Sequence, residues 1–370
     1  MSLLPLLLSE IRSRGPMTAA EFMELALYHP SLGYYSRAEQ RSGRAGDFYT
    51  SVDVGPLFGE MIAAQLAEMW EVLRSRGADA FDIVEAGAGN GRLARDVMDA
   101  AAREFPELYR CIRLTLVERS AAARHAQAAR LGPHVERVAA MRTSLPADVT
   151  GVIYANELLD AFPVHVVTRT SEGLREIAVS ERDGILVESL MPLSSDQLVE
   201  HLRSADVVLD VGARVEVALA ASAWVAEAAE ALCRGFLLLF DYGREAHQLH
   251  SAYPGGTLTT YRGHRSAAED WLTDPGERDL TAHVDLTGVR RTAEACGLET
   301  LGILDQTYFL LSLGLAERLE TGHDQPAMRQ RLAARTIMMP GGLGSTMKAM
   351  VFAKNVGRPP LRSTASGRLT

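Results

Sequence analysis

The sequence has few cysteines, no long apolar run and no excess of positive charge. Its three cysteines, Cys111, Cys233 and Cys296, are widely spaced and form no C-x-x-C pair. This pattern argues against a disulfide framework and a zinc site, so no metal is expected. It is typical of a reducing compartment. No stretch approaches the roughly 18 apolar residues that a membrane span needs.

The charge balance makes nucleic acid a poor candidate ligand. Lys and Arg number 38 against 47 Asp and Glu, for a net charge of -9, so no general phosphate-binding surface is implied. The apolar start at residues 3–8 contains Pro5 and soon meets Glu10 and Arg12, which predicts a packed helix rather than a signal peptide. A reducing compartment leads us to expect a cytoplasmic protein, or one of the mitochondrial matrix if the chain is eukaryotic, though no clear transit peptide is seen.

What the sequence does contain predicts a globular α/β protein. Hydrophobic residues make up 47% and charged residues 23%, enough for one large or two modest domains. Apolar runs alternate with amphipathic segments, which predicts a Rossmann-like, mainly parallel doubly wound sheet. The expected strands are 82–85, 112–118, 135–138, 151–155, 236–241, 298–306 and 347–354, and the expected helices are 19–27, 56–73, 91–105, 120–130 and 214–232.

Three parts are expected along the chain. Residues 1–75 form a helical N-terminal region, 76–357 form the main domain, and 358–370 form a flexible tail. The main domain has insertions at about 163–195 and 242–290. The first contains short consecutive strands at 164–170, 174–180 and 185–191, which predicts an antiparallel sheet. The second is too long to be a mere connector, and such loops often carry function.

A glycine-rich turn predicts a nucleotide-sized site. A strand ending at Glu85 runs into Gly87, Gly89 and Gly91, and then into a helix. Glycine permits unusual backbone conformations and close approach of a ligand, and the helix start offers free N–H groups. The third glycine comes one position too early for the dinucleotide fingerprint. Glu85, the acidic residue before the first glycine, favours S-adenosyl-L-methionine as the ligand, because this molecule has cationic groups and no pyrophosphate.

An acidic side chain ends the next strand of the predicted sheet. Glu118 ends the strand 112–118, where a carboxylate can accept both ribose hydroxyls of an adenosine. NAD-binding folds also place a carboxylate at this position, so Glu118 indicates a bound nucleoside but does not distinguish between the two cofactors. The alternative is that Glu85 and Glu118 are solvated strand ends.

Asn156, Glu157 and Asp160 follow the strand 151–155, at the edge where such sheets bind ligands. There they would orient the N–H bonds of a methyl acceptor, and carboxylates would hold a guanidinium through forked hydrogen bonds. Alternatively, Asn156 and Asp160 are helix caps and Glu157 a surface residue. His283 suits a structural role at least as well as that of a base, and the roles of His264 and Asp285 stay open.

Motifs through nearly the whole chain resemble the MidA-like methyltransferases, the family of the mitochondrial complex I assembly arginine methyltransferase. The matching stretches are residues 29–35, 46–51, 85–91, 156–164, 241–243, 256–261 and 279–285. The resemblance implies a class I methyltransferase fold that uses S-adenosyl-L-methionine and releases S-adenosyl-L-homocysteine. It implies N-methylation of a protein arginine, with symmetric dimethylarginine as product.

The resemblance also assigns site residues. The glycine motif, Glu118 and Asn156 bind the donor. A loop with Gly46, Asp47 and Thr50 closes its pocket, beneath the N-terminal region. Asn156 and Glu157 belong to the catalytic face.

The sequence departs from the family pattern in places that bear on the acceptor. Val52-Asp53 stands where the family has Pro-Glu, and residues 343–348 read Leu-Gly-Ser-Thr-Met-Lys instead of Met-Gly-x-x-Phe-Lys. The expected partner is a protein with an accessible arginine, and the oligomeric state stays open. The alternatives are methylation of a small metabolite and a non-catalytic assembly factor that keeps the fold.

Overall fold

The computed structural model describes residues 2–36, 50–262, 265–266, 271–320, 325–338 and 343–365. The chain divides into two compact units. The first, here called the sheet unit, comprises Tyr49–Leu158, Val225–Tyr242 and Thr292–Thr370. The second, here called the insertion unit, comprises Met1–Phe48, Leu159–Trp224 and Gly243–Arg291. The expected N-terminal region 1–75 is therefore divided: residues 1–48 are grouped with both of the segments expected as insertions, and residues 49–75 with the sheet unit.

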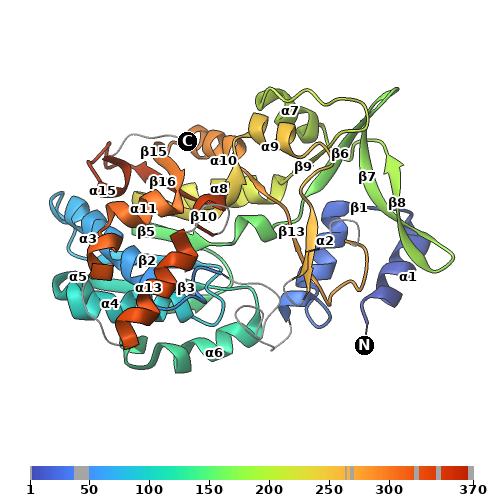
Figure 1. The fold of residues 1–370 in the computed structure, drawn as a ribbon. Helices are drawn as coiled ribbons and strands as arrows, with labels where there is room; N and C mark the ends of the chain where they lie inside the picture. Colours follow the sequence, from blue (N-terminus) through green and yellow to red (C-terminus); the bar gives the residue numbers. More distant parts are fainter. Residues whose placement is uncertain are drawn as a thin grey trace. The chain divides into compact units, whose positions relative to one another are not determined.

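The sheet unit is built on one twisted sheet (Figure 1). Its strand order is β4-β3-β2-β5-β10-β16-β15. The pairings from β4 to β10 are parallel, and β16 is antiparallel to both of its neighbours. The expected mainly parallel, doubly wound sheet is thereby confirmed. The strands are β2 (Phe81–Ala86), β3 (Ile112–Val117), β4 (Val138–Arg142), β5 (Val149–Asn156), β10 (Leu232–Arg244), β15 (Glu299–Asp305) and β16 (Met347–Lys354).

The order of strands along the chain reverses at β2. From β2 the chain continues to β3 and β4 on one side, and then crosses to β5 and β10 on the other. At such a switch point the loops after neighbouring strands diverge and leave a crevice beyond the carboxyl ends of the strands. The loops after β2 and β5 contain the glycine motif and Asn156-Glu157, so the topology brings the two predicted motifs to one edge.

Helices α3 (Leu57–Arg74) and α4 (Arg92–Glu104) pack together in the core of the sheet unit (Figure 1). Gly59 permits their close approach, because a Cβ at this position would lie 2.6 Å from Cβ of Asp96. The other helical segments of this unit are α5 (Pro106–Cys111), α6 (Ala121–Leu131), η2 (Gly132–Arg137), α11 (Gln306–Ser312), α12 (Leu315–Glu320), α13 (Gln325–Met338), α14 (Leu343–Thr346) and α15 (Arg362–Ala365).

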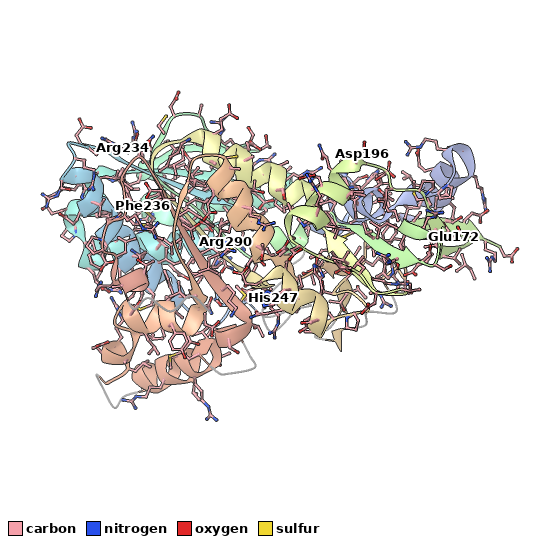
Figure 2. All side chains as sticks on the ribbon, turned by 90° about the horizontal axis from the view of Figure 1, so that it is seen from above. Glu172, Asp196, Arg234, Phe236, His247 and Arg290 are labelled. Atoms are coloured by element: carbon pink, nitrogen blue, oxygen red, sulfur yellow. The ribbon has the colours of Figure 1, made fainter. Side chains whose placement is uncertain are left out.

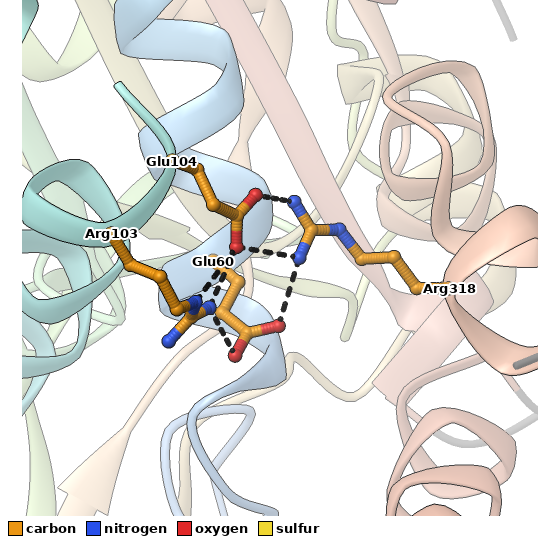
Figure 3. Close-up of polar contacts among 4 residues, drawn as sticks. All are labelled: Glu60, Arg103, Glu104 and Arg318. Atoms are coloured by element: carbon orange, nitrogen blue, oxygen red, sulfur yellow. Dashed lines mark hydrogen bonds and ion pairs between the residues drawn. The ribbon is translucent and has the colours of Figure 1, made fainter. Parts of the chain in front are cut away.

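A four-residue ionic network joins three of these helices (Figure 3). Arg318 of α12 donates to Glu60 of α3 over 3.2 Å and to both carboxylate oxygens of Glu104 in α4. Arg103 donates to Glu60 over 3.0 Å and to Glu104 over 2.6 Å. Glu60 is buried, so its charge depends on these two arginines. The network therefore fastens α12 to the α3–α4 pair.

The expected tail begins with a packed segment. Leu361 is buried in the core of the sheet unit, and the hydroxyl of Ser363 in α15 donates to Oε1 of Gln65. Residues 366–370 lie outside the described part of the chain.

The insertion unit contains an antiparallel sheet of order β1-β7-β6-β9, with β8 paired to β7. The turn between β6 and β7 forms a hairpin, and Glu172 lies at its tip (Figure 2). The antiparallel insertion expected from the sequence is thereby confirmed. The strands are β1 (Met17–Thr18), β6 (His165–Thr170), β7 (Gly173–Arg182), β8 (Ile185–Met191) and β9 (Arg214–Val217).

Helices α1 (Leu4–Arg14) and α2 (Ala19–Tyr28) belong to the same apolar core as this sheet. Thr18 and Glu21 form a reciprocal capping box at the start of α2, the motif that fixes where such a helix begins. The remaining elements that lie in or reach into this unit are η1 (Tyr34–Ser36), η3 (Leu159–Ala161), α7 (Asp196–Ser204), α8 (Leu219–Ala231), α9 (Ala246–Ala252), β11 (Thr259–Arg262), β12 (Arg265–Ser266), β13 (Asp279–Thr281), β14 (Val284–Asp285) and α10 (Leu286–Ala295).

Two expected elements have different bounds. The helix expected over 214–232 begins as strand β9, because Val215 and Val217 alternate into the core and pair with β6. The strand expected near 135–138 lies at Val138–Arg142, after the 3₁₀ turn η2. Alanine-rich composition and short apolar runs do not fix such boundaries, because pairing with distant strands decides them.

Candidate functional site

The glycine motif forms a left-handed turn between β2 and α4. Gly87, Gly89 and Gly91 have φ of 70°, 50° and 82°, values that other residues rarely adopt. The Gly91 N–H donates to the carbonyl of Ala88 over 2.8 Å, and Gly91 is the N-cap of α4. Alternate glycines thus let the chain turn sharply from the strand into the helix.

The surroundings of these glycines differ. A Cβ added to Gly89 would meet no other atom of the described chain within 4 Å, whereas at Gly87 it would lie 3.1 Å from Cδ1 of Leu158. The open space that a ligand needs therefore lies beside Gly89. Gly87 instead lets the turn pack against the residue that follows Glu157.

Glu118, directly after β3, is tied to the glycine turn. Its Oε2 accepts from the Gly89 N–H over 2.8 Å, and its Oε1 accepts from the Ser120 N–H over 2.7 Å. A carboxylate has about four acceptor sites, so each oxygen keeps capacity for a further donor such as a ribose hydroxyl. The structure thus brings Glu118 and Gly89 together, as the prediction of a nucleoside site requires.

Glu85 lies beneath the turn rather than at its surface. Its side chain is 3% exposed, and Oε2 accepts from the hydroxyl of Tyr154 in β5 over 2.9 Å. Burial raises the pKa of Glu85 to about 8, while hydrogen bonds from Tyr154 and the backbone N–H of Ala94 oppose the rise. Because Ala94 lies in the first turn of α4, Glu85 links β2, β5 and the helix that follows the turn.

The loop after β5 presents Asn156 and Glu157 together. Glu157 has φ of 51°, a left-handed conformation that is costly for a residue with a side chain. Its N–H donates to the carbonyl of Phe240 over 2.8 Å. Its carboxylate accepts from Nδ2 of Asn156 and from the hydroxyl of Tyr242, each over 3.2 Å. Strained backbone held by several contacts is a common feature of functional sites.

Asp241, in the last part of β10, holds this loop in place. It is 1% exposed. Its Oδ2 accepts from the Leu158 N–H over 3.2 Å and its Oδ1 from the Tyr242 N–H over 2.8 Å. One buried carboxylate therefore positions both neighbours of the Glu157 side chain: the chain that follows it and the tyrosine that donates to it.

Asn156 has one polar atom without a partner. Among the described residues, its buried Oδ1 accepts no hydrogen bond. Its Nδ2 is already bound to Glu157. An unpaired buried oxygen is costly, and at this edge of the sheet it would be satisfied by a donor from a ligand.

Only part of the predicted pocket loop is described. Gly46 and Asp47 lie outside the described residues, as does His264. Thr50 donates from its hydroxyl and its N–H to Oδ2 of Asp53, over 3.0 and 3.1 Å. The other oxygen of Asp53 accepts from Arg92 over 2.9 Å. Asp53 therefore ties residues 50–53 to the start of α4.

Asp160 belongs to the insertion unit. Its Oδ2 accepts from the Thr281 hydroxyl over 2.8 Å, and burial raises its pKa to about 6 against the opposing effect of that bond. His283 and Asp285 are in the same unit, where the His283 N–H donates to Thr257 and Oδ1 of Asp285 accepts from Thr287. Within the sheet unit, the structure thus unites only Asn156 and Glu157 of the three residues predicted to be catalytic.

Sequence reasoning missed the roles of Tyr154, Asp241 and Gln127. Gln127 in α6 donates from Nε2 to the Gly89 carbonyl over 2.9 Å. For Asp241 a signal exists, because it is an acidic residue directly after an apolar strand, like Glu118. Tyr154 and Gln127 carry no such signal, since each makes its contact with a residue far away in sequence.

The described residues contain neither a candidate membrane span nor a candidate metal cluster. No helix among them is both long and apolar enough to cross a membrane. No group of three or more His, Cys, Asp and Glu side chains among them is placed to hold a metal ion.

Comparison with known proteins identifies the class. The family model described as "Putative S-adenosyl-L-methionine-dependent methyltransferase" matches residues 61–304. The chain therefore belongs to this family of S-adenosyl-L-methionine-dependent methyltransferases. It uses S-adenosyl-L-methionine as methyl donor and forms S-adenosyl-L-homocysteine, as the sequence predicted.

Curated relatives and a solved structure match most of the chain. The mouse protein named "Protein arginine methyltransferase NDUFAF7, mitochondrial" is 30% identical, over 88% of this chain and 78% of its own length. The zebrafish (Danio rerio) protein of the same name is 31% identical, over 90% and 81%. A Burkholderia thailandensis protein described as a "likely methyl transferase", solved with bound S-adenosyl-homocysteine, is 28% identical with a TM-score of 0.88, over 99% of this chain and 95% of that one. These matches confirm the family resemblance and the methyltransferase fold.

Proposed function

We propose that this methyltransferase N-methylates an arginine side chain of a protein substrate, with the carboxylate of Glu157 holding the guanidinium. The observation that carries the proposal is the position of Glu157: a strained residue at the switch point of the sheet, its carboxylate fixed by Asn156 and Tyr242. The relatives named protein arginine methyltransferases support the same acceptor.

The residues at the glycine turn fit the donor. We infer that the open backbone beside Gly89, the Glu118 carboxylate and the unpaired Oδ1 of Asn156 hold S-adenosyl-L-methionine. Bound there, the donor supplies a methyl group on a cationic sulfur. Glu85 supports the turn from below through Tyr154 and Ala94. We further propose that Gly46, Asp47 and Thr50 help to enclose the donor, as the family resemblance implies.

Glu157 has two tasks in this proposal. A guanidinium is always charged in proteins and presents N–H groups in a planar fork, which a fixed carboxylate accepts with defined geometry. The attacking nitrogen must also lose a proton as its new bond to carbon forms. The carboxylate that already accepts that N–H is the natural base. Asn156 and Tyr242 keep it oriented, so little reorganisation is needed at the moment of transfer.

We keep Asp160 as a proposed catalytic residue, as the sequence predicts. The bond from the Thr281 hydroxyl fixes its carboxylate.

The variant Glu157→Gln tests the proposal. It keeps the size of the side chain but removes the charge, so turnover on an arginine substrate should fall by about 10² or more. Affinity for S-adenosyl-L-homocysteine, measured by calorimetry, should stay within about twofold of the wild type, since the donor contacts are elsewhere. The matched control is Glu172→Gln at the exposed hairpin tip, which should change neither quantity.

The product identifies the acceptor. Incubating the enzyme with labelled donor and a lysate that lacks it should label a protein, and fragmentation of its peptides should show methylarginine. The family resemblance leads us to propose the symmetric dimethyl isomer. Label only on lysine, a carboxylate or a small metabolite would contradict the arginine proposal and favour the metabolite alternative.

The names of the animal relatives also bear on location. They are mitochondrial proteins, and this gives no support to the cytoplasmic location expected from the cysteine pattern. We propose the mitochondrial matrix as the location of this protein if the chain is eukaryotic.

A further inference from the structure

Gln127 is a buried polar residue on helix α6, where His125 and Arg130 are exposed. Together with Leu131 it forms the buried side of α6, and its exposed fraction is 0%. Glutamine is rarely found fully buried unless its amide is hydrogen bonded. Its presence here therefore needs an explanation.

One half of the amide is bonded and the other is not. Nε2 donates to the Gly89 carbonyl over 2.9 Å. A carbonyl can only accept, so the NH₂ group must face Gly89 and Oε1 must point elsewhere. Among the described residues, that buried Oε1 finds no hydrogen-bond donor.

A buried glutamine with an unpaired Oε1 is not explained by its contribution to fold stability. Leaving a buried acceptor unpaired costs free energy, and an apolar side chain of similar shape at position 127 would avoid that cost. Gly89 is only partly buried, so its carbonyl would then be open to water. The neighbourhood would accept an apolar side chain, because the side chains of Gln127 and Leu116 lie together beside Gly91. Residues that reduce stability without a structural gain are expected at functional sites.

The bonded half explains what Gln127 does. Its bond holds the Gly89 carbonyl, while Glu118 holds the Gly89 N–H over 2.8 Å. Both backbone groups of the glycine with open space beside it are thus fixed by side chains from two other elements. Gly89 is otherwise free to leave its φ of 50°, and ordering a loop on binding weakens affinity.

We propose that Gln127 is a positioning residue for the methyl donor: it fixes the Gly89 carbonyl, and with it the turn that faces the donor, at the expense of fold stability. The inference rests on the proposed donor site at the glycine turn and is independent of the acceptor. It predicts opposite effects of one substitution on stability and on donor affinity, which a purely structural residue would not show.

The first experiment uses Gln127→Leu and Gln127→Met in the full chain. The dissociation constant for S-adenosyl-L-homocysteine, measured by calorimetry, should rise roughly three- to tenfold, the effect of one hydrogen bond. The Tm of the ligand-free protein should stay the same or increase. A lower Tm together with weaker binding would mean that Gln127 is only a packing residue, and would overturn the proposal.

The second experiment uses Gln127→Glu to restore the bond by protonation. The ionised carboxylate cannot donate and repels the Gly89 carbonyl, and burial raises its pKa above the ordinary range. Below that pKa the protonated carboxyl can donate to Gly89. The ratio of variant to wild-type dissociation constants should therefore fall as the pH is lowered, while the same ratio for Gln127→Leu should not change. A pH-independent ratio for Gln127→Glu would count against the proposal.

A control separates this inference from the placement of the site. Glu118→Ala should weaken donor binding if the donor lies at the glycine turn. If Glu118→Ala binds weakly and Gln127→Leu binds normally, the donor site stands and the role of Gln127 is wrong. If both variants bind normally, the donor lies elsewhere and both proposals fail.

Discussion

Replacing Glu85 by glutamine should change how the stability of the protein depends on pH. The buried carboxyl has a pKa of about 8 in the folded protein against an ordinary value of 4.5. Its ionisation is therefore harder in the folded than in the unfolded state. Stability from this group is fully present below pH 4.5 and is lost as the pH rises through about 8. Glutamine has almost the same shape and does not ionise, so the variant escapes this loss.

The expected size follows from the two pKa values. They differ by about 3.5, and one pKa unit corresponds to about 1.4 kcal/mol, so the full difference approaches 5 kcal/mol. The free energy of unfolding of the Glu85→Gln variant, relative to that of the wild type, should increase by about 1.4 kcal/mol per pH unit between pH 5 and 8. Above pH 8 this difference should level off. Water reaching the ionised Glu85 carboxylate would make this free-energy difference smaller but would not change its sign.

The measurement is the free energy of unfolding by urea at pH 5, 6, 7, 8 and 9 for both proteins. Glu172→Gln serves as the control, because that side chain is exposed and its substitution should give a small, constant difference. A difference between Glu85→Gln and the wild type that does not change with pH would refute the reasoning, and would mean that Glu85 ionises without penalty beneath the turn.

Three further outcomes are expected. Glu118→Ala should weaken binding of S-adenosyl-L-homocysteine by roughly 1–3 kcal/mol in calorimetry, because it removes charge-assisted hydrogen bonds; unchanged affinity would make Glu118 a simple strand end. Tyr242→Phe should lower kcat and leave donor affinity intact, since it removes one hydrogen bond that orients the Glu157 carboxylate; an unchanged kcat would argue against a positioning role. Arg318→Met should lower the free energy of unfolding by about 1–3 kcal/mol, because it leaves buried Glu60 with Arg103 alone; wild-type stability would show that Arg103 suffices.

The class of protein and its donor were readable from the sequence because their signals are local. The glycine motif, the strand before it and the helix after it occupy adjacent residues, and glycine is required where φ is positive. Glu118 and Asn156-Glu157 were found because parallel strands end at one edge of a sheet, so acidic and amide residues after successive apolar runs are brought together. The alternating pattern of 164–191 likewise predicted its antiparallel strands.

The tertiary structure decided what each of these residues touches. Glu85 is predicted as a donor ligand from its place before the glycines, and only the fold shows that the hydroxyl of Tyr154, 69 residues away, donates to its carboxylate. Asp241 holds the Glu157 loop from 83 residues away, and Gln127 holds Gly89 across 38. Residues 1–75 were expected to form one helical region, but the fold groups α1 and α2 with the antiparallel insertion and α3 with the main sheet. Sequence patterns show which face of a helix or strand is apolar. Which faces pack against each other depends on contacts between distant segments, and only the folded chain determines those contacts.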